Sequence, residues 1–213
     1  MGFTGSLILG RSRVSLLDLL APHEVELVGR LDDLWQLAAV MGEVADVPGW
    51  AAALVEGTAA PVLIAVIDDS DTALLLADSP LGHRWITVLN APADSAGRAA
   101  VADTRAMTEI AKTAVAWAAE AGHTVALEPV LTALCAADRD NRAADQAWND
   151  AAGDIAAMSA IVRNQISFIE VYVLRVLAAL EVSVPALNLE SWWAHLAQQA
   201  HSPSPYPGDL PTG

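Results

Sequence analysis

The hydrophobic pattern of this chain changes period near residue 91, and that change constrains the fold more than any other feature. Before it, short apolar runs alternate with turn residues at close spacing, which is typical of β-strands. After it, apolar residues recur every three or four positions, as on one face of a helix. No long Gly/Ser-rich or charged stretch separates the halves, so we expect two layers of one domain.

The expected fold class is α+β. A small, mainly antiparallel sheet over residues 5–90 is covered by a helical C-terminal half over residues 91–201. We take 1–201 as a single domain. Residues 202–213 contain four prolines and form a tail that we expect to be disordered.

The expected strands cover residues 5–11, 34–41, 62–67, 72–77 and 83–89. The continuously apolar run 62–67 favours a central strand, and the two runs after it complete an antiparallel meander. The run 34–41 is rich in alanine and could equally be helical. Two short helices are expected among these strands. One opens at Ser15, and the other covers 48–56 with Asp46 as N-cap and Gly57 as its stop.

The expected helices of the second half cover residues 97–121, 128–137, 143–181 with an interruption near Gly153, and 188–200. Residues 138–142 are charged or amidic and predict a break between helices. The stretch 166–180 is apolar on nearly every side, so it must be buried in the domain or against a partner. The second possibility makes a homo-oligomer through this helix a candidate.

Charge and composition exclude several classes of protein. The chain of 213 residues has 26 acidic and 11 basic side chains, a formal net charge of −15, which argues against nucleic acid or an anionic membrane as its main partner. Hydrophobic residues at 54% and charged residues at 17% exclude an intrinsically disordered chain. Charged residues interrupt the longest apolar stretches, so we expect no membrane span.

The single cysteine, Cys135, cannot form an internal disulfide, so we expect a cytoplasmic protein. Cys135 falls on an apolar helix face and is expected to be a small core residue rather than a nucleophile. The five histidines show no pair at metal-ligand spacing, and no cofactor is expected.

Asp68, Asp69 and Asp71 are the most concentrated polar feature. Three carboxylates at the end of a central strand could hold Mg²⁺ or Ca²⁺ through oxygen ligands. The spacing lacks the glycine and the distal glutamate of a calcium loop, so a hairpin turn is the favoured interpretation. A third interpretation places the three side chains on an acidic recognition surface.

Seven tryptophans stand beside only two phenylalanines and two tyrosines. Exposed aromatic side chains often anchor interfaces, and the candidates for such a surface are Trp85, Trp148, Trp192 and Trp193. The other three, Trp35, Trp50 and Trp117, fall in apolar runs and are expected in the core.

Several short motifs resemble uncharacterised actinobacterial proteins that open Met-Gly-x-Thr/Ser-Gly and carry an apolar strand leading into Asp-Ser-Asp. The matching positions are Met1, Gly2, Thr4, Gly5, Gly10-Arg11-Ser12, Ala60-Pro61-Val62, Asp69-Ser70-Asp71 and the run 85–90. They cover less than half of the chain. The resemblance implies a shared fold and source rather than a function.

Three functions from different classes remain open. The first is an acidic module that binds a basic protein partner, most concretely an immunity or antitoxin-like neutraliser. The second is an enzyme that uses a divalent metal at Asp68, Asp69 and Asp71. The third is a structural or oligomerisation module built on the apolar helix 166–180.

Overall fold

The computed structural model describes residues 3–20, 25–30, 34–42, 45–91, 104–164 and 168–182. By its internal contacts the chain divides into two units, residues 1–183 and 184–213. The expected helix 188–200, the tail 202–213 and the boundary between residues 201 and 202 lie outside the described residues, so these expectations stay predictions.

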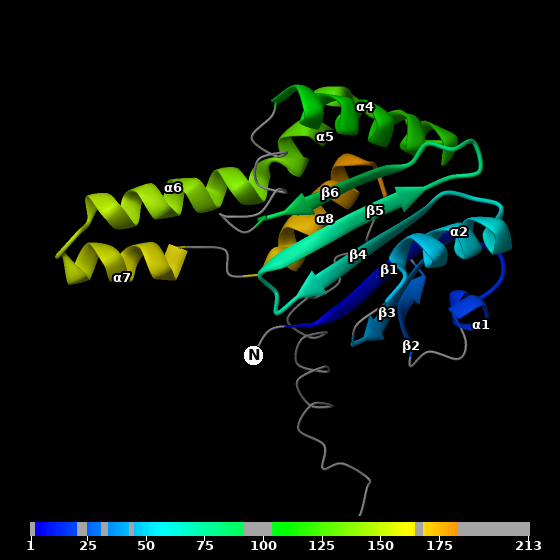
Figure 1. Ribbon diagram of the computed structural model, residues 1–213, viewed down its shortest axis with the longest axis horizontal. Coiled ribbons are helices and arrows are strands. Elements are labelled where there is room, and N and C mark those ends of the chain that lie inside the picture. The colour runs from blue at the N-terminus through cyan, green and yellow to red at the C-terminus, as the bar shows by residue number, and fades with distance from the viewer. Residues whose placement is uncertain are drawn as a thin grey trace, which may run out of the picture. The chain divides into compact units, whose positions relative to one another are not determined.

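A six-stranded antiparallel sheet organises the described residues of the first unit (Figure 1). In the order in which they pair, its strands are β2 (Val25–Arg30), β3 (Trp35–Met41), β1 (Gly5–Arg11), β4 (Val62–Asp68), β5 (Thr72–Asp78) and β6 (Trp85–Leu89). The α+β class is confirmed, and β4 to β6 form the expected meander. Strand β2 has no counterpart among the predictions, because Glu26, Gly29 and Arg30 interrupt its apolar pattern.

Strand β1 lies between β3 and β4, and its first six residues are buried. Apolar side chains at successive positions suit a strand that is covered on both faces of the sheet. The strand starts at Gly5, where a Cβ atom would collide with the backbone carbonyl oxygen of Val40 on the neighbouring strand. Glycine therefore permits the close approach of β1 and β3 at this point.

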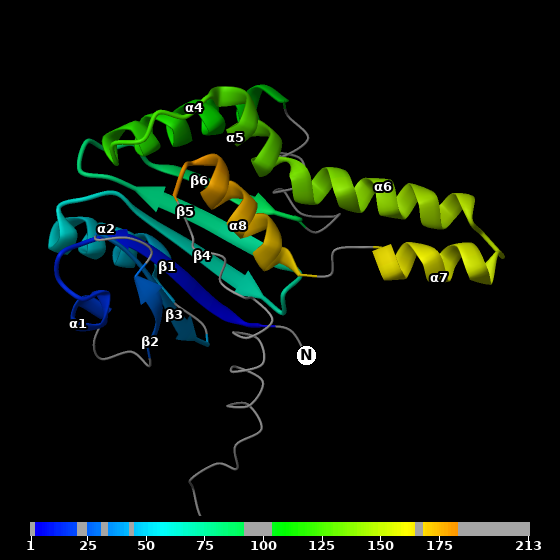
Figure 2. The same cartoon turned by 180° about the vertical axis from the view of Figure 1, so that it is seen from behind.

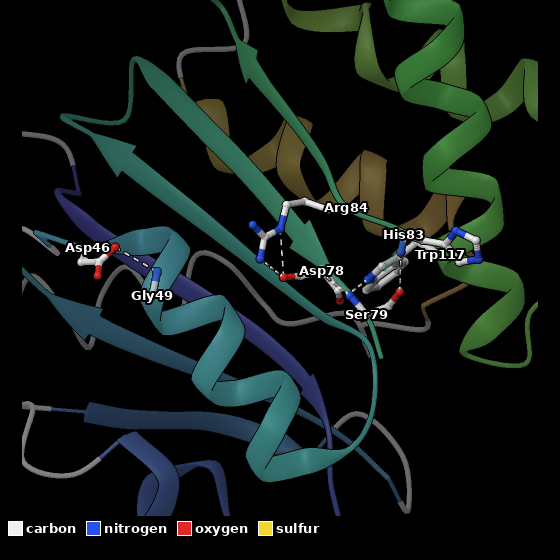
Figure 3. Close-up of polar contacts among 7 residues, drawn as sticks. All are labelled: Asp46, Gly49, Asp78, Ser79, His83, Arg84 and Trp117. Carbon is white, nitrogen blue, oxygen red and sulfur yellow. Dashed lines mark hydrogen bonds and ion pairs between the residues drawn. The ribbon is translucent and has the colours of Figure 1, made fainter. Parts of the chain in front are cut away.

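One face of the sheet is covered by α1 (Leu16–Leu20) and α2 (Val47–Thr58). The Asp46 side chain caps α2 by accepting a hydrogen bond from the Gly49 amide at 2.9 Å, as predicted (Figure 3). The expected stop at Gly57 is wrong by two residues, because Ala59 adopts the left-handed conformation that ends the helix. The core on this face consists of Ile8, Leu16, Leu20, Ala38, Val40, Val47, Ala51, Leu54, Val62, Ile64 and Leu76.

The opposite face is covered by α8 (Ile169–Ala179), as the view from behind shows, and α5 (Leu127–Leu134) packs against α8 (Figure 2). Helix α4 (Thr104–Glu120) packs on β5 and β6. Its Trp117 is fully buried, donates from Nε1 to the Asp78 carbonyl oxygen at 2.9 Å, and packs on Trp35 of β3 with ring centroids 5.9 Å apart. Trp35 and Trp117 are therefore core residues, as predicted. Trp50 is half-buried against the core beneath α1 and α2.

Most of the large apolar side chains of α8 are buried within this chain. Ile169, Tyr172, Val173, Val176 and Leu177 are at most 5% exposed, and the helix packs on β4, β5, β6 and α5. Phe168, which directly precedes the helix, is 47% exposed, and the expectation of a homo-oligomer through helix 166–180 stays a prediction. Among the residues that the structure describes, no helix has both the length and the apolar character needed to cross a membrane.

Helices α6 (Ala136–Asp150) and α7 (Ile155–Asn164) run side by side away from the sheet (Figures 1 and 2). The expected break over residues 138–142 is wrong, because these residues form the first turns of α6. Their charges fit a helix whose flank contacts water, which the sequence pattern alone does not distinguish from a loop. The expected interruption near Gly153 is confirmed, with Gly153 at a φ of 92° between the two helices.

A buried amide holds the segment before α1. Gln36 on β3 is 2% exposed, its Oε1 accepts from the Leu16 amide at 3.0 Å, and its Nε2 donates to the carbonyl oxygens of Ser12 and Val14 at 2.8 Å each. We predict that Gln36→Leu lowers the free energy of unfolding by about 2–4 kcal/mol, because the near-isosteric leucine leaves these backbone groups unpaired.

Urea unfolding at neutral pH measures this loss. The control is Gln146→Leu on α6, an exposed site where a substitution usually changes stability by less than about 0.5 kcal/mol. Equal losses in the two variants would contradict the capping role of Gln36.

Candidate functional site

The three acids singled out in the sequence lie in the hairpin turn between β4 and β5. Asp69 and Ser70 have φ angles of 45° and 58°, and the Asp71 amide donates to the Asp68 carbonyl oxygen at 2.9 Å. Positive φ at both central residues is the mark of a type I′ hairpin turn. Asp68, Asp69 and Asp71 are exposed. The φ angles and this hydrogen bond agree with the turn interpretation. Among the described residues, no group of three or more His, Cys, Asp or Glu side chains could hold a metal ion.

Ser70, between these acids, is buried and joins three segments of the chain. Its Oγ accepts from the Phe3 amide at 2.7 Å and donates to Glu170 Oε1 at 2.6 Å. Its backbone amide donates to the Phe3 carbonyl oxygen at 2.9 Å, and its carbonyl oxygen accepts from the Ile169 amide at 2.9 Å. We call these four bonds the Ser70 anchor. They attach the start of β1 and the start of α8 to the same turn.

Glu170 is the buried carboxyl group of this anchor. It is 0% exposed, and among the residues that the structure describes its Oε2 atom has no hydrogen-bond partner. Burial raises the pKa of Glu170 above its ordinary value, against the opposing effects of the hydrogen bonds from Ser70 and from its own backbone. Sequence reasoning missed both residues, although a single acid among the apolar residues of 166–180 is a usable signal for a buried polar contact.

A second set of contacts attaches the start of α6 to the same turn. Asn90, which follows β6 with a φ of 56°, donates from Nδ2 to the Asp71 carbonyl oxygen at 2.7 Å. Its Oδ1 accepts a hydrogen bond from Asn141 Nδ2 of α6. The turn is therefore linked through Asn90 to the helix that leads away from the sheet and through Ser70 to the helix that returns to it.

The start of α6 also contacts α8 directly. The Tyr172 hydroxyl donates to Asp140 Oδ2 at 3.1 Å, Arg175 lies 3.5 Å from the same oxygen, and the Arg175 guanidinium stands 4.9 Å from the Tyr172 ring centroid. Burial, followed by the charge of Asp140, raises the pKa of Tyr172, so the phenol stays protonated and donates this hydrogen bond at neutral pH.

We call residues 139–164 of α6, α7 and their connection the arm. Between residues 139 and 161 no side chain is buried, and the buried residues of α6 are Ala136, Ala137 and Asp138. Asp154 caps α7, because its Oδ1 accepts from the Ala156 and Ala157 amides at 2.9 and 3.0 Å. Trp148 is 44% exposed and Ile155 is 79% exposed. Trp148 thus meets the expectation of an exposed aromatic side chain.

The expectation that Trp85 is exposed is wrong, since this side chain is 3% exposed. In register Trp85 pairs with Ala77 on β5, and both lie on the sheet face opposite to that of Leu76 and Ile86. The indole is therefore a core group on the face of the sheet that α8 covers. Trp192 and Trp193 lie outside the described residues.

A cleft of about 590 Å³ lies beside β5 and β6, between α2 and α4. Its lining is Pro48, Leu76, Arg84, Trp85, Ile86, Glu109, Ile110 and Thr113. Arg84 donates from Nε and Nη2 to Asp78 Oδ2, and the Oδ1 of Asp78 accepts from the Ser79 amide (Figure 3). These bonds, and then the negative charge of Asp78, raise the pKa of Arg84, so the guanidinium is charged at every accessible pH. The sequence patterns did not indicate this cleft, because its walls come from four separate elements.

Cys135 is half-buried between α5 and α6. Burial, followed by the charge of Asp138, raises the pKa of its thiol. A reactive cysteine needs the opposite shift, so the surroundings of Cys135 agree with a packing role.

Comparison with family models, with curated proteins and with solved structures finds no match to this chain. The resemblance to actinobacterial proteins stays a prediction.

The buried carboxyl group makes stability depend on pH. Because the folded-state pKa of Glu170 lies above its unfolded value, the folded state prefers the protonated acid, and stability falls as the pH rises from the unfolded pKa through the folded one. We predict that Glu170→Gln is more stable than the natural chain by about 1 kcal/mol at neutral pH, because the amide keeps a partner for Ser70 and carries no charge.

The difference should vanish below the unfolded-state pKa, about pH 4, where both side chains are neutral. Urea unfolding at the two pH values measures it, with Glu56→Gln at an exposed site on α2 as the matched control. A Glu170→Gln variant with the same advantage at both pH values would show that the charge plays no part.

Proposed function

We propose that this protein is an acidic protein-binding module whose partner is a basic protein. The observation that carries the proposal is the charge of the surface. Among the described residues, twelve acidic and seven basic side chains are exposed. The exposed acids are Asp18, Asp46, Glu56, Asp68, Asp69, Asp71, Glu109, Glu128, Asp145, Asp150, Asp154 and Glu181.

Much of the exposed positive charge is already paired with carboxylates of this chain. Arg84 pairs with Asp78, Lys112 with Glu109, and both Arg139 and Arg175 with Asp140. Four of the seven exposed bases therefore lie beside three carboxylates of this chain. The field outside the molecule is negative, which accelerates encounters with cationic proteins and opposes binding of nucleic acid.

An immunity or antitoxin-like neutraliser is the finer form of this proposal. In that case the basic partner has its own activity, and one equivalent of this chain suppresses it. Such a pair belongs in the cytoplasm of the cell that makes both proteins. The alternative of a divalent-metal enzyme at Asp68, Asp69 and Asp71 finds no support in the described residues. For the oligomerisation alternative, most of the large apolar side chains of α8 already pack within this chain.

We predict that affinity for the partner depends steeply on salt. Basic proteins retained on the immobilised chain at low ionic strength are purified singly and titrated against it by calorimetry. The expected result is a 1:1 complex whose Kd rises at least about tenfold between about 0.05 and 0.5 M NaCl, because salt screens the attraction between opposite charges.

A DNA duplex and an acidic protein of similar size serve as controls and should not bind. The proposal fails if no purified basic protein forms a 1:1 complex at about 0.15 M salt, or if the DNA duplex binds as tightly as the protein.

A further inference from the structure

The sheet has two outer strands, β2 and β6, which differ in how well they resist pairing with another chain. An edge strand has a row of backbone N–H and C=O groups that can bind a further strand. Strand β2 contains the charged residues Glu26 and Arg30, and its pairing with β3 shifts register between Leu27 and Gly29. Charges and bulges are the usual means by which an edge strand resists such pairing. Strand β2 is therefore a protected edge.

Strand β6 has neither kind of protection. Its sequence, Trp-Ile-Thr-Val-Leu, contains no charge, proline or glycine, and it pairs with β5 without a register shift. Its Ile86 is 51% exposed. Within the part of the chain that the structure describes, no strand pairs with the outer side of β6, and no turn or loop forms a hydrogen bond with its backbone. We therefore call β6 the open edge of the described sheet.

The cleft beside α4 adjoins the open edge. Helix α4 runs alongside β6 (Figure 1), and the Thr87 hydroxyl of β6 lies 3.9 Å from the Met107 sulfur of α4. Thr87 points to the same face of the sheet as Trp85, which α8 also covers. On the other face, Ile86 and its cross-strand neighbour Leu76 line the cleft of about 590 Å³ together with Ile110 of α4. An apolar cleft therefore lies next to the unpaired side of β6.

The open edge and the cleft together select the form of the occupant. A row of backbone donors and acceptors is matched by another extended backbone, which lies about 4.8 Å from the strand that it joins. Side chains of an added strand alternate between the two faces of the sheet, so every second one points toward the cleft. A cleft of this volume accommodates such side chains.

The charges beside the cleft indicate an uncharged occupant. Arg84 pairs with Asp78, and Glu109 pairs with Lys112. A charged side chain that entered the cleft would lose its hydration without an unpaired opposite charge to replace it, whereas an apolar side chain would not.

The same quantities disfavour a second copy of this chain as the occupant. Each copy has a net charge of −15, so two copies repel each other. A strand of five residues also supplies only part of the roughly 800 Å² that each partner buries in a stable dimer. A short segment of a different polypeptide meets neither obstacle.

From these observations we infer that the open edge of β6 binds an extended, uncharged segment of another polypeptide, which adds a strand to the sheet and places apolar side chains in the cleft beside Ile86 and Ile110. In this mode of recognition, backbone hydrogen bonds supply affinity, and the pockets for alternate side chains supply specificity. The inference goes beyond the proposed function, because it depends on backbone pairing and apolar contact and not on the charge of the surface.

The first test uses labelled peptides of about seven residues in which threonine alternates with valine, leucine or phenylalanine, and it measures affinity by fluorescence anisotropy. The control for each peptide is its form N-methylated at the central residues, which keeps the side chains and lacks the N–H donors. We expect the tightest-binding peptide to bind at least about tenfold more tightly than its N-methylated form. Its Kd should change less than about twofold between about 0.05 and 0.5 M NaCl, because the peptide carries no charged side chain.

The second test locates the added strand. Ile86→Lys introduces on β6 the kind of charge that protects edge strands, and it should weaken binding of that peptide at least about fivefold. The matched control is Leu81→Lys, which changes an apolar residue 74% exposed in the turn before β6 and should alter the affinity less than about twofold. Hydrogen exchange with the peptide bound should slow at least about tenfold within residues 85–89 and stay unchanged within residues 25–30 of β2.

Several outcomes overturn the inference and leave the proposed function standing. They are the absence of binding by every peptide at about 1 mM, equal binding of the N-methylated forms, equal weakening by the two lysine variants, and protection of residues 25–30 in place of 85–89. Sedimentation tests the remaining occupant: if the natural chain self-associates and Ile86→Lys makes it monomeric, the open edge joins two copies and the inference is wrong. Far-UV circular dichroism confirms that each variant is folded.

Discussion

The turn around Ser70 is the contact on which the helical part of this structure depends. A buried serine in a left-handed conformation is locally unfavourable, and it is retained here because four hydrogen bonds join it to Phe3, Ile169 and Glu170. The carbonyl of the next residue, Asp71, holds α6 through Asn90 and Asn141. One four-residue turn thereby positions the helix that leaves the sheet and the helix that returns to it.

Within the acidic cluster, the residues that face water differ from the residue that holds the fold together. The carboxylates of Asp68, Asp69 and Asp71 point into water, while the residue between them carries the contacts that hold the fold together. The arm repeats the same division. Its base is fixed by polar contacts with Asn90, Tyr172 and Arg175, and its far part has exposed apolar and acidic groups without a core.

The local patterns predicted most of the described elements. The apolar run 62–67 led to a central strand, Asp46 to a helix cap, and Gly153 to a helix end, because each depends on a few neighbouring residues. The errors have a common cause, which is that pairing or packing with other residues overrides the local sequence pattern. Strand β2 has a mixed pattern that its pairing with β3 overrides, and residues 138–142 are helical because α6 starts from the packed residues Ala136 and Ala137.

The sequence by itself determined the α+β class, the change from strands to helices near residue 91, the exposure of Trp148 and the net charge of −15, because periodicity, composition and local polarity are properties of consecutive residues. Only the tertiary structure decided that Trp85 is buried, that α8 packs on its own sheet and that Ser70 pairs with Glu170. These outcomes depend on contacts between residues up to 100 positions apart. Such contacts form only when the strands pair and the helices pack on the sheet, and no local sequence pattern encodes them.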